Sequence, residues 1–105
     1  MTQELDYLIL GAHPDDAELW CGGLILKMRQ AGYAVGLCDC TRGEAGTHGT
    51  VVERDAETAL ANEIIKPAMR VNLGLPDGGL TDDLASRQAI VRVIRQYRPK
   101  VLVAP

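Results

Sequence analysis

Short apolar runs alternate along the chain with longer segments in which apolar residues recur at helical spacing. The apolar runs are four to seven residues long and are bounded by glycine, proline or polar residues, as buried strands are. We predict strands at Tyr7–Leu10, Ala34–Cys40, Met69–Leu73 and Val101–Ala104. The segments between them predict helices at about Ala17–Ala31, Val52–Ile65 and Asp83–Tyr97. The expected order of elements is therefore β-α-β-α-β-α-β.

Each predicted helix carries apolar residues that should pack on a sheet, and each ends at a suitable residue. Gly32, Pro67 and Pro99 stand where the three helices should stop. We expect the inward positions to be Trp20, Leu24, Ile25 and Met28 in the first helix, Ala56, Ala59, Leu60 and Ile64 in the second, and Ile90, Val93, Ile94 and Tyr97 in the third.

The regular alternation of strands and helices predicts the α/β class. We expect a Rossmann-like parallel sheet with right-handed crossovers and helices on both faces. A chain of 105 residues has room for one domain. The last predicted strand, 101–104, is apolar enough for a central place in a sheet, yet it is the final element. We therefore expect residues 1–105 to be the N-terminal portion of a single, larger three-layer domain.

Composition and charge exclude several classes of partner. The net charge is −3 and there is no basic run, so nothing favours nucleic acid or an anionic membrane. No apolar stretch reaches the length of a bilayer span, and the polar, acidic amino terminus is unlike a secretory signal. The cysteines are odd in number and lack zinc-ribbon spacing, which favours reduced thiols and a cytoplasmic location. They are Cys21, Cys38 and Cys40.

Residues able to bind a metal or to take part in catalysis are concentrated in the loops that should follow the carboxyl ends of the strands. Ligands bind at this edge of parallel α/β sheets. The three loops are Ala12–Asp16, Thr41–Val51 and Gly74–Asp83. We therefore expect the functional site where these loops meet.

The segment His13-Pro14-Asp15-Asp16 favours a metal site. Pro14 has a fixed φ and holds the preceding residue extended, which makes a stiff bend. Two adjacent carboxylates beside an imidazole repel each other unless a cation is present. Histidine and aspartate together suit zinc, although iron(II) or another divalent ion could bind. One carboxylate could then bind the metal while the other accepts a proton from a water molecule that the metal activates.

A structural role for the same carboxylates is the alternative. Asp15 or Asp16 could cap the following helix through a side-chain oxygen. Glu18 would then complement the helix dipole. The combination with His13, directly after an apolar strand and Gly11, favours the metal site.

Several segments resemble one known family. Gly11–Glu18, followed by Cys21-Gly22-Gly23, resembles the signature of the PIG-L/LmbE-like zinc-dependent N-deacetylases. Further segments match this family in order, and they are Asp39–Thr47, Val51–Arg54, Asn72–Gly78 and Arg98–Val101. The resemblance covers essentially the whole chain. It is closest to the branch that includes the bacillithiol-pathway N-acetylglucosaminyl-malate deacetylases.

The resemblance implies a function and a set of site residues. The expected activity is a metal-dependent hydrolase that removes an N-acetyl group from a small-molecule amino-sugar conjugate. His13 and Asp16 would bind Zn²⁺, Asp15 would be the general base, and Arg54 would hold polar groups of the substrate. Glu18 would brace the loop. The matched glycines would allow close helix packing (Gly22 and Gly23) or turns (Gly74 and Gly78).

The printed sequence departs from the family at one point. The family takes its third metal ligand, and a histidine that stabilises the transition state, from a His-Pro-Asp-His segment beyond the fourth strand. No such segment occurs before Pro105. His48 is the only other histidine, and we expect it to be an ordinary loop residue, with metal binding as the alternative. An exposed strand edge could also favour a homo-oligomer.

Two other classes of protein remain as alternatives. One is a non-catalytic α/β fragment or interaction module that lacks a complete metal site. The other is a flavodoxin-like nucleotide-binding domain, which would need a phosphate-binding loop where Pro14, Asp15 and Asp16 stand. The sequence has no GxGxxG, no P-loop and no G-x-S-x-G segment, so dinucleotide, P-loop and serine-hydrolase functions have no direct support.

Overall fold

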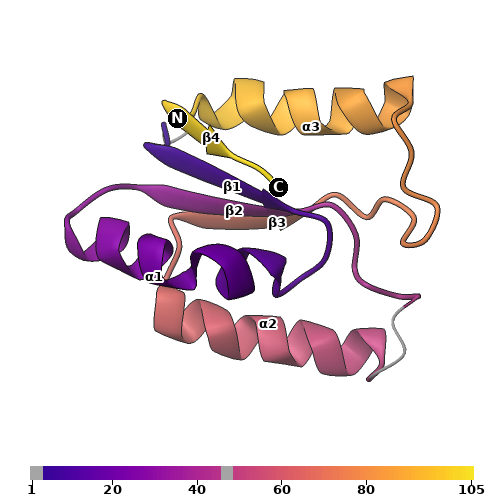
Figure 1. Ribbon diagram of the computed structural model, residues 1–105, viewed down its shortest axis with the longest axis horizontal. Coiled ribbons are helices and arrows are strands. Elements are labelled where there is room, and N and C mark those ends of the chain that lie inside the picture. Colours follow the sequence, from indigo (N-terminus) through magenta and orange to yellow (C-terminus); the bar gives the residue numbers. More distant parts are fainter. Residues whose placement is uncertain (1–3, 46–48) are drawn as a thin grey trace.

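The computed structural model describes residues 4–45 and 49–105, and in these residues four strands alternate with three helices (Figure 1). The strands are β1 (Tyr7–Gly11), β2 (Val35–Asp39), β3 (Met69–Asn72) and β4 (Val101–Val103). The helices are α1 (Asp16–Gln30), α2 (Val51–Ile65) and α3 (Leu84–Tyr97). The predicted order of elements is confirmed.

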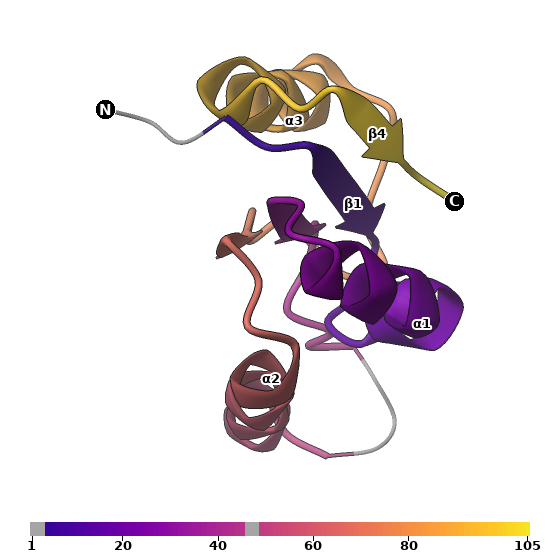
Figure 2. The ribbon, with the colours of Figure 1, turned by 90° about the vertical axis from the view of Figure 1, so that its left-hand side faces the viewer.

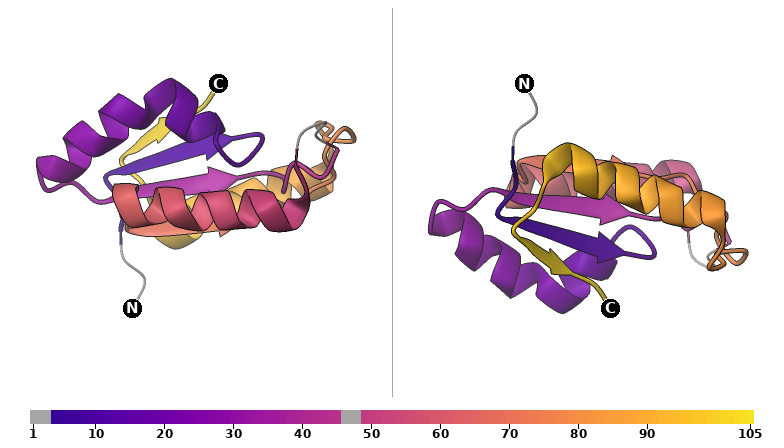
Figure 3. Two further views of the ribbon diagram at one scale, coloured as in Figure 1. Left: turned by 90° about the horizontal axis from the view of Figure 1, so that it is seen from below. Right: turned by 90° about the horizontal axis from the view of Figure 1, so that it is seen from above.

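All strand pairs are parallel, and the order across the sheet is β3-β2-β1-β4. Helices α1 and α2 cover one face of the sheet and α3 covers the other, which gives three layers (Figures 2 and 3). The chain steps outward from β1 to β3 and then returns to the far side of β1. The order of strands thus reverses beside β1, and in such folds ligands bind at the carboxyl ends of the strands near this reversal.

The core consists of two apolar layers, one on each face of the sheet. Neighbouring residues of β1 point to opposite faces, so Ile9 joins one layer and Leu8 the other. The layer under α1 and α2 contains Ile9, Ala17, Ile25, Val35, Leu37 and Ile65. The layer under α3 contains Leu5, Leu8, Cys38 and Val93. Residues Ile94 and Tyr97 also pack there, which confirms the predicted inward face of α3.

The predicted inward faces of α1 and α2 are partly wrong. Ile25 is fully buried, but Trp20 is 55% exposed, and Leu60 and Ile64 are 62% and 72% exposed. Apolar residues lie around much of α1, so their spacing does not fix which side faces the sheet. In α2 the residue buried against the sheet is Ile65.

The fourth strand is three residues long and forms one edge of the sheet in the described part of the chain. Val101 and Leu102 are exposed there. The expected central place of this strand in a larger domain stays a prediction.

Gly22 and Gly23 were expected to allow close packing of α1, but no other described atom lies within 4 Å of a Cβ built at either position. Gly74 and Gly78 have positive φ, as their turns require.

The three cysteines are free thiols in the structure, as the sequence suggested. Burial raises the pKa of Cys38 to about 12, so this thiol stays protonated near neutral pH.

Among the described helices, none is both long and apolar enough to cross a bilayer.

Asp83 caps the N-terminus of α3 and makes its stability dependent on pH. Its carboxylate accepts hydrogen bonds from the Thr81 hydroxyl (2.6 Å) and the Ser86 backbone N–H (2.8 Å). These bonds lower its pKa from 3.8 to about 2. The charged form is therefore favoured in the folded protein. Its contribution to stability is fully present above about pH 4 and is lost as the pH falls through about 2.

We therefore expect Asp83→Asn to change the pH dependence of folding. Asparagine still caps a helix, so the variant should fold. The difference in urea midpoint between the wild type and the variant should be largest near neutral pH and should shrink as the pH falls from about 4 to about 2. A difference that stays constant over this range would contradict the assignment.

Candidate functional site

The loops that follow β1, β2 and β3 meet at the carboxyl edge of the sheet and line an open cavity of about 470 Å³. Its lining includes all four residues that the sequence proposed for the site, which come from two separate parts of the chain. The residues around the cavity are His13, Asp15, Asp16, Gly43, Ala45, Arg54, Asp77 and Gly78. The fold thus brings the predicted site residues together.

His13 is held by contacts on both sides of its ring. Its Nε2 lies 2.7 Å from Oδ1 of Asp77, and its Nδ1 lies 3.5 Å from Oδ2 of Asp16. The same Asp16 oxygen accepts a hydrogen bond from the His13 backbone N–H (2.9 Å). Because a carboxylate oxygen can only accept, the hydrogen of a neutral His13 ring sits on Nε2. The lone pair of Nδ1 is then on the side of Asp16.

The spacing of these two atoms fits a metal. In a tetrahedral zinc site with bonds of about 2.0–2.1 Å, the ligand atoms are roughly 3.3–3.4 Å apart. Nδ1 of His13 and Oδ2 of Asp16, 3.5 Å apart, have nearly this separation. They are the residues that could hold a metal ion.

The described part of the chain does not contain a complete set of ligands. Within it, no group of three or more histidine, cysteine or acidic side chains is placed to hold a metal ion. His48, the alternative ligand, lies outside the described residues. The described residues therefore supply two converging donors, whereas a catalytic zinc site uses three protein ligands.

Asp15 occupies the N-cap position of α1 but does not cap the helix with its side chain. Among the described residues its carboxylate accepts no cap hydrogen bond; only its backbone carbonyl accepts, from the Leu19 N–H. Its φ of 89° lies in the left-handed region. Non-glycine residues in this region carry strain and are concentrated at functional sites. The structural alternative, in which Asp15 is simply a helix cap, is not supported.

The environment of Asp15 favours proton transfer. Partial burial, and next the charge of Asp16, raise the pKa of Asp15, while the Arg54 guanidinium opposes this rise. A carboxylate with a raised pKa holds a proton more readily after it has accepted one. In the metal-free chain, Asp15 thus holds a proton more readily than an exposed aspartate does.

Arg54 reaches the cavity from the first turn of α2 and passes beside the loop that follows β2. Its Nη1 would lie 3.0 Å from a Cβ at position 43, where Gly43 has a φ of 70°. Glycine therefore permits both the turn and the close approach of the guanidinium. The position of Arg54 in the lining is compatible with substrate binding.

One residue of the site, Asp77, was not singled out from the sequence. Asp77 accepts the backbone N–H of Ala45 with Oδ2 (2.9 Å), in addition to its contact with His13. Its own N–H donates to Oε2 of Glu44 (2.8 Å). From the sequence, Pro76-Asp77-Gly78 is a turn within the family-matched segment Asn72–Gly78, with no role assigned to Asp77. An acidic residue in a loop at the carboxyl edge of the sheet was the available signal.

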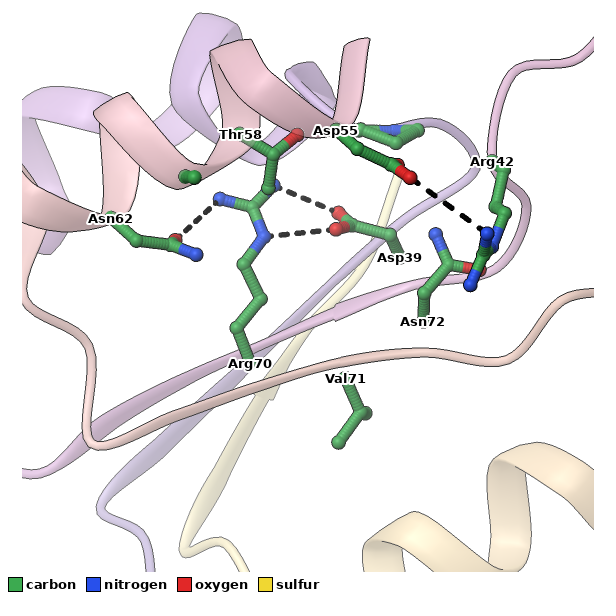
Figure 4. A pocket seen from close by; sticks show the side chains of 10 residues that line it. Asp39, Arg42, Asp55, Thr58, Asn62, Arg70, Val71 and Asn72 are labelled. Carbon is green, nitrogen blue, oxygen red and sulfur yellow. Dashed lines mark hydrogen bonds and ion pairs between the residues drawn. The ribbon is translucent and has the colours of Figure 1, made fainter. Parts of the chain in front are cut away.

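Beside the site, a buried charge network centred on Arg70 joins α1 and α2 to the sheet, and Figure 4 shows its contacts with Asp39 and Asn62. Arg70 of β3 donates to Asp39 of β2 (2.9 and 3.2 Å), to Glu18 of α1 (3.1 Å twice) and to Asn62 of α2 (3.1 Å). Glu18 lies two residues after Asp16, so the network holds the first turn of α1 against the sheet. The expected bracing role of Glu18 therefore has a partner, Arg70. A second cavity, of about 260 Å³, borders this network.

Together the parallel sheet, its three layers and the His-Asp-Asp cluster at the strand ends define an α/β protein with a polar ligand site at the carboxyl edge. The chain belongs to the PIG-L family, whose model, described as GlcNAc-PI de-N-acetylase, matches residues 8–105. The family resemblance inferred from the sequence is confirmed.

Three relatives show how far the similarity extends. The conserved protein TT1542 from Thermus thermophilus superposes with a TM-score of 0.90 at 44% identity over 96% of this chain and 46% of that one. The uncharacterized deacetylase YaiS of Escherichia coli is 34% identical over 67% of this chain and 37% of its own length. Diacetylchitobiose deacetylase of Thermococcus kodakarensis is 30% identical over 93% of this chain and 39% of its own length. The chain thus spans less than half the length of each.

Proposed function

We propose that this chain carries the metal-binding part of a zinc-dependent N-deacetylase that hydrolyses the acetamide of an amino-sugar conjugate. The observation that carries the proposal is the convergence of His13 Nδ1 and Asp16 Oδ2, with Asp15 beside them, on one cavity. Membership of the PIG-L family supports the reaction class. The name of the Thermococcus relative, diacetylchitobiose deacetylase, supports an N-acetylated amino-sugar as the substrate.

In this proposal His13 and Asp16 are metal ligands. Zinc suits one imidazole and one carboxylate, and another divalent ion could replace it. The third protein ligand would come from outside the described residues, from a His-Pro-Asp-His segment or, as the alternative, from His48. When bound, the ion would polarise the acetamide carbonyl and lower the pKa of a water molecule.

The other residues of the cavity would carry the proton and the substrate. Asp15 accepts a proton from the water molecule that attacks the carbonyl carbon. It then donates this proton to the amine nitrogen as the carbon–nitrogen bond breaks, so that acetate and a free amino-sugar leave. Asp15 lines the same cavity as His13 and Asp16, which places its carboxylate beside the proposed metal ligands. Arg54, also in the cavity lining, would hold polar groups of the sugar.

The test measures metal content and acetate release by the intact protein with N-acetylglucosamine conjugates. Treatment with a chelator should abolish acetate release, and added zinc should restore it. His13→Ala and Asp16→Ala should each lose the metal and reduce turnover at least about a hundredfold. Arg87→Ala, which changes an exposed ion pair on α3, should retain both properties. Full activity of the chelated protein would overturn the proposal.

One observation favours the second candidate, a non-catalytic α/β module. Only two converging metal donors are present among the described residues. An intact protein that binds zinc but releases no acetate from any amino-sugar conjugate would support this alternative. The nucleotide-binding alternative has less support, because Asp15 and Asp16 line the cavity where a phosphate would have to bind.

A further inference from the structure

Asp77 connects all three loops that surround the candidate site. It lies in the loop after β3, and its side chain is 9% exposed. Oδ1 contacts Nε2 of His13 in the loop after β1, and Oδ2 accepts the N–H of Ala45 in the loop after β2. Both carboxylate oxygens are thus used, one by a side chain and one by the backbone. An aspartate in an exposed turn can form the turn without either of these two contacts.

The contact with His13 determines what the imidazole can do. The 2.7 Å separation holds the hydrogen of Nε2 against the carboxylate and prevents free rotation of the ring. With the ring held in this way, Nδ1 stays 3.5 Å from Oδ2 of Asp16. If the ring turned over about its Cβ–Cγ bond, the carbon Cδ2 would take the place of Nδ1 beside Asp16, and the pair of donors would be lost.

We propose that Asp77 is a positioning residue for His13: its carboxylate fixes the ring so that Nδ1 and Asp16 form a preorganised pair of metal donors. The inference rests on the proposed function for the role of His13 as a ligand. Carboxylates that accept the second N–H of a metal-binding histidine orient the ring and raise its basicity, and their loss lowers metal affinity about 10- to 100-fold.

The first measurement needs no metal and no substrate. In the metal-free intact protein, proton NMR should show a downfield-shifted imidazole proton from Nε2 of His13. The signal is assigned by its absence from His13→Gln. It should be lost in Asp77→Ala and weakened in Asp77→Asn, in which the amide oxygen accepts without a negative charge. If the wild type lacks this signal, the inference is wrong.

The second measurement compares affinities for Zn²⁺ by competition with a chromophoric chelator. Asp77→Asn keeps the shape of the side chain and should bind zinc about 10- to 100-fold more weakly than the wild type. Glu44→Ala is the matched control, because Glu44 binds the backbone N–H of Asp77 and not its carboxylate. This control should keep the imidazole signal and the wild-type affinity.

The outcomes separate this inference from the proposed function. If the wild type binds no zinc, the proposed function fails, whatever the imidazole signal shows. If the wild type binds zinc and Asp77→Asn binds it equally tightly, only the positioning role of Asp77 is overturned. If Glu44→Ala loses as much affinity as Asp77→Asn, Asp77 acts by tying the loops together, and the inference is again overturned.

Discussion

Replacement of Asp15 by asparagine is expected to reduce deacetylation by a factor of about 10² to 10⁴ while the metal remains bound. The amide cannot accept the proton that the attacking water must lose, whereas the proposed ligands, His13 and Asp16, are untouched. Asparagine is the appropriate replacement because it tolerates the left-handed backbone at this position better than alanine does. The loop should therefore keep its conformation.

Two measurements on one preparation check this expectation: acetate release and zinc content per chain. Asp16→Asn serves as the comparison and should lose zinc together with activity. If Asp15→Asn also loses its zinc, the division of roles between Asp15 and Asp16 is incorrect. If Asp15→Asn keeps full activity, Asp15 is not the general base.

Replacement of Arg70 by alanine is expected to lower the free energy of unfolding by about 3–5 kcal/mol. The Arg70 side chain is 6% exposed and that of Asp39 is 3% exposed, so the variant would leave an unpaired charge in the interior. Burial already raises the pKa of Asp39 against the opposing effect of Arg70, which shows how poorly this position is solvated. A loss of this size is a large part of the stability of a small domain.

Denaturant unfolding of the two-residue variant Arg70→Met/Asp39→Leu separates loss of pairing from loss of packing. Removing Arg70 and Asp39 together should restore part of the stability, because Asp39 no longer stays buried without a partner, while Glu18, whose side chain is 20% exposed, still loses its contacts with Arg70. Arg87→Ala is the surface control, since the pair between Arg87 and Asp82 is exposed, and it should leave the unfolding midpoint nearly unchanged. A small effect of Arg70→Ala would mean that water reaches Asp39 when Arg70 is removed.

Much of the fold was predictable because its signals are local. Four apolar runs, each ended by a turn residue, identify the strands, and the alternation with helices specifies a parallel sheet. The side of α1 and α2 that faces the sheet was not predictable. In α1 the apolar residues surround the helix, and contacts with the sheet decide that Ile25 is buried and Trp20 is exposed.

The candidate site, like the fold, was only partly predictable from the sequence. His13, Asp15 and Asp16 were found because they are adjacent in a stiff segment directly after a strand. Asp77 and Arg70 were missed because His13 is 64 residues from Asp77, and the acidic partners of Arg70 are 31 and 52 residues from it. No periodic pattern marks such pairs. Contacts of this kind become visible only when the strand order places the loops side by side.

Under the proposed role of Asp15 as general base, the left-handed backbone at position 15 puts stability and activity in opposition. Every residue with a Cβ atom is strained there, and glycine would relieve that strain without any clash of its own. Screening of random substitutions for thermal stability alone would thus enrich glycine at this position. The variants recovered would be more stable and would lack deacetylase activity. A carboxylate is retained at this position only where turnover itself is under selection.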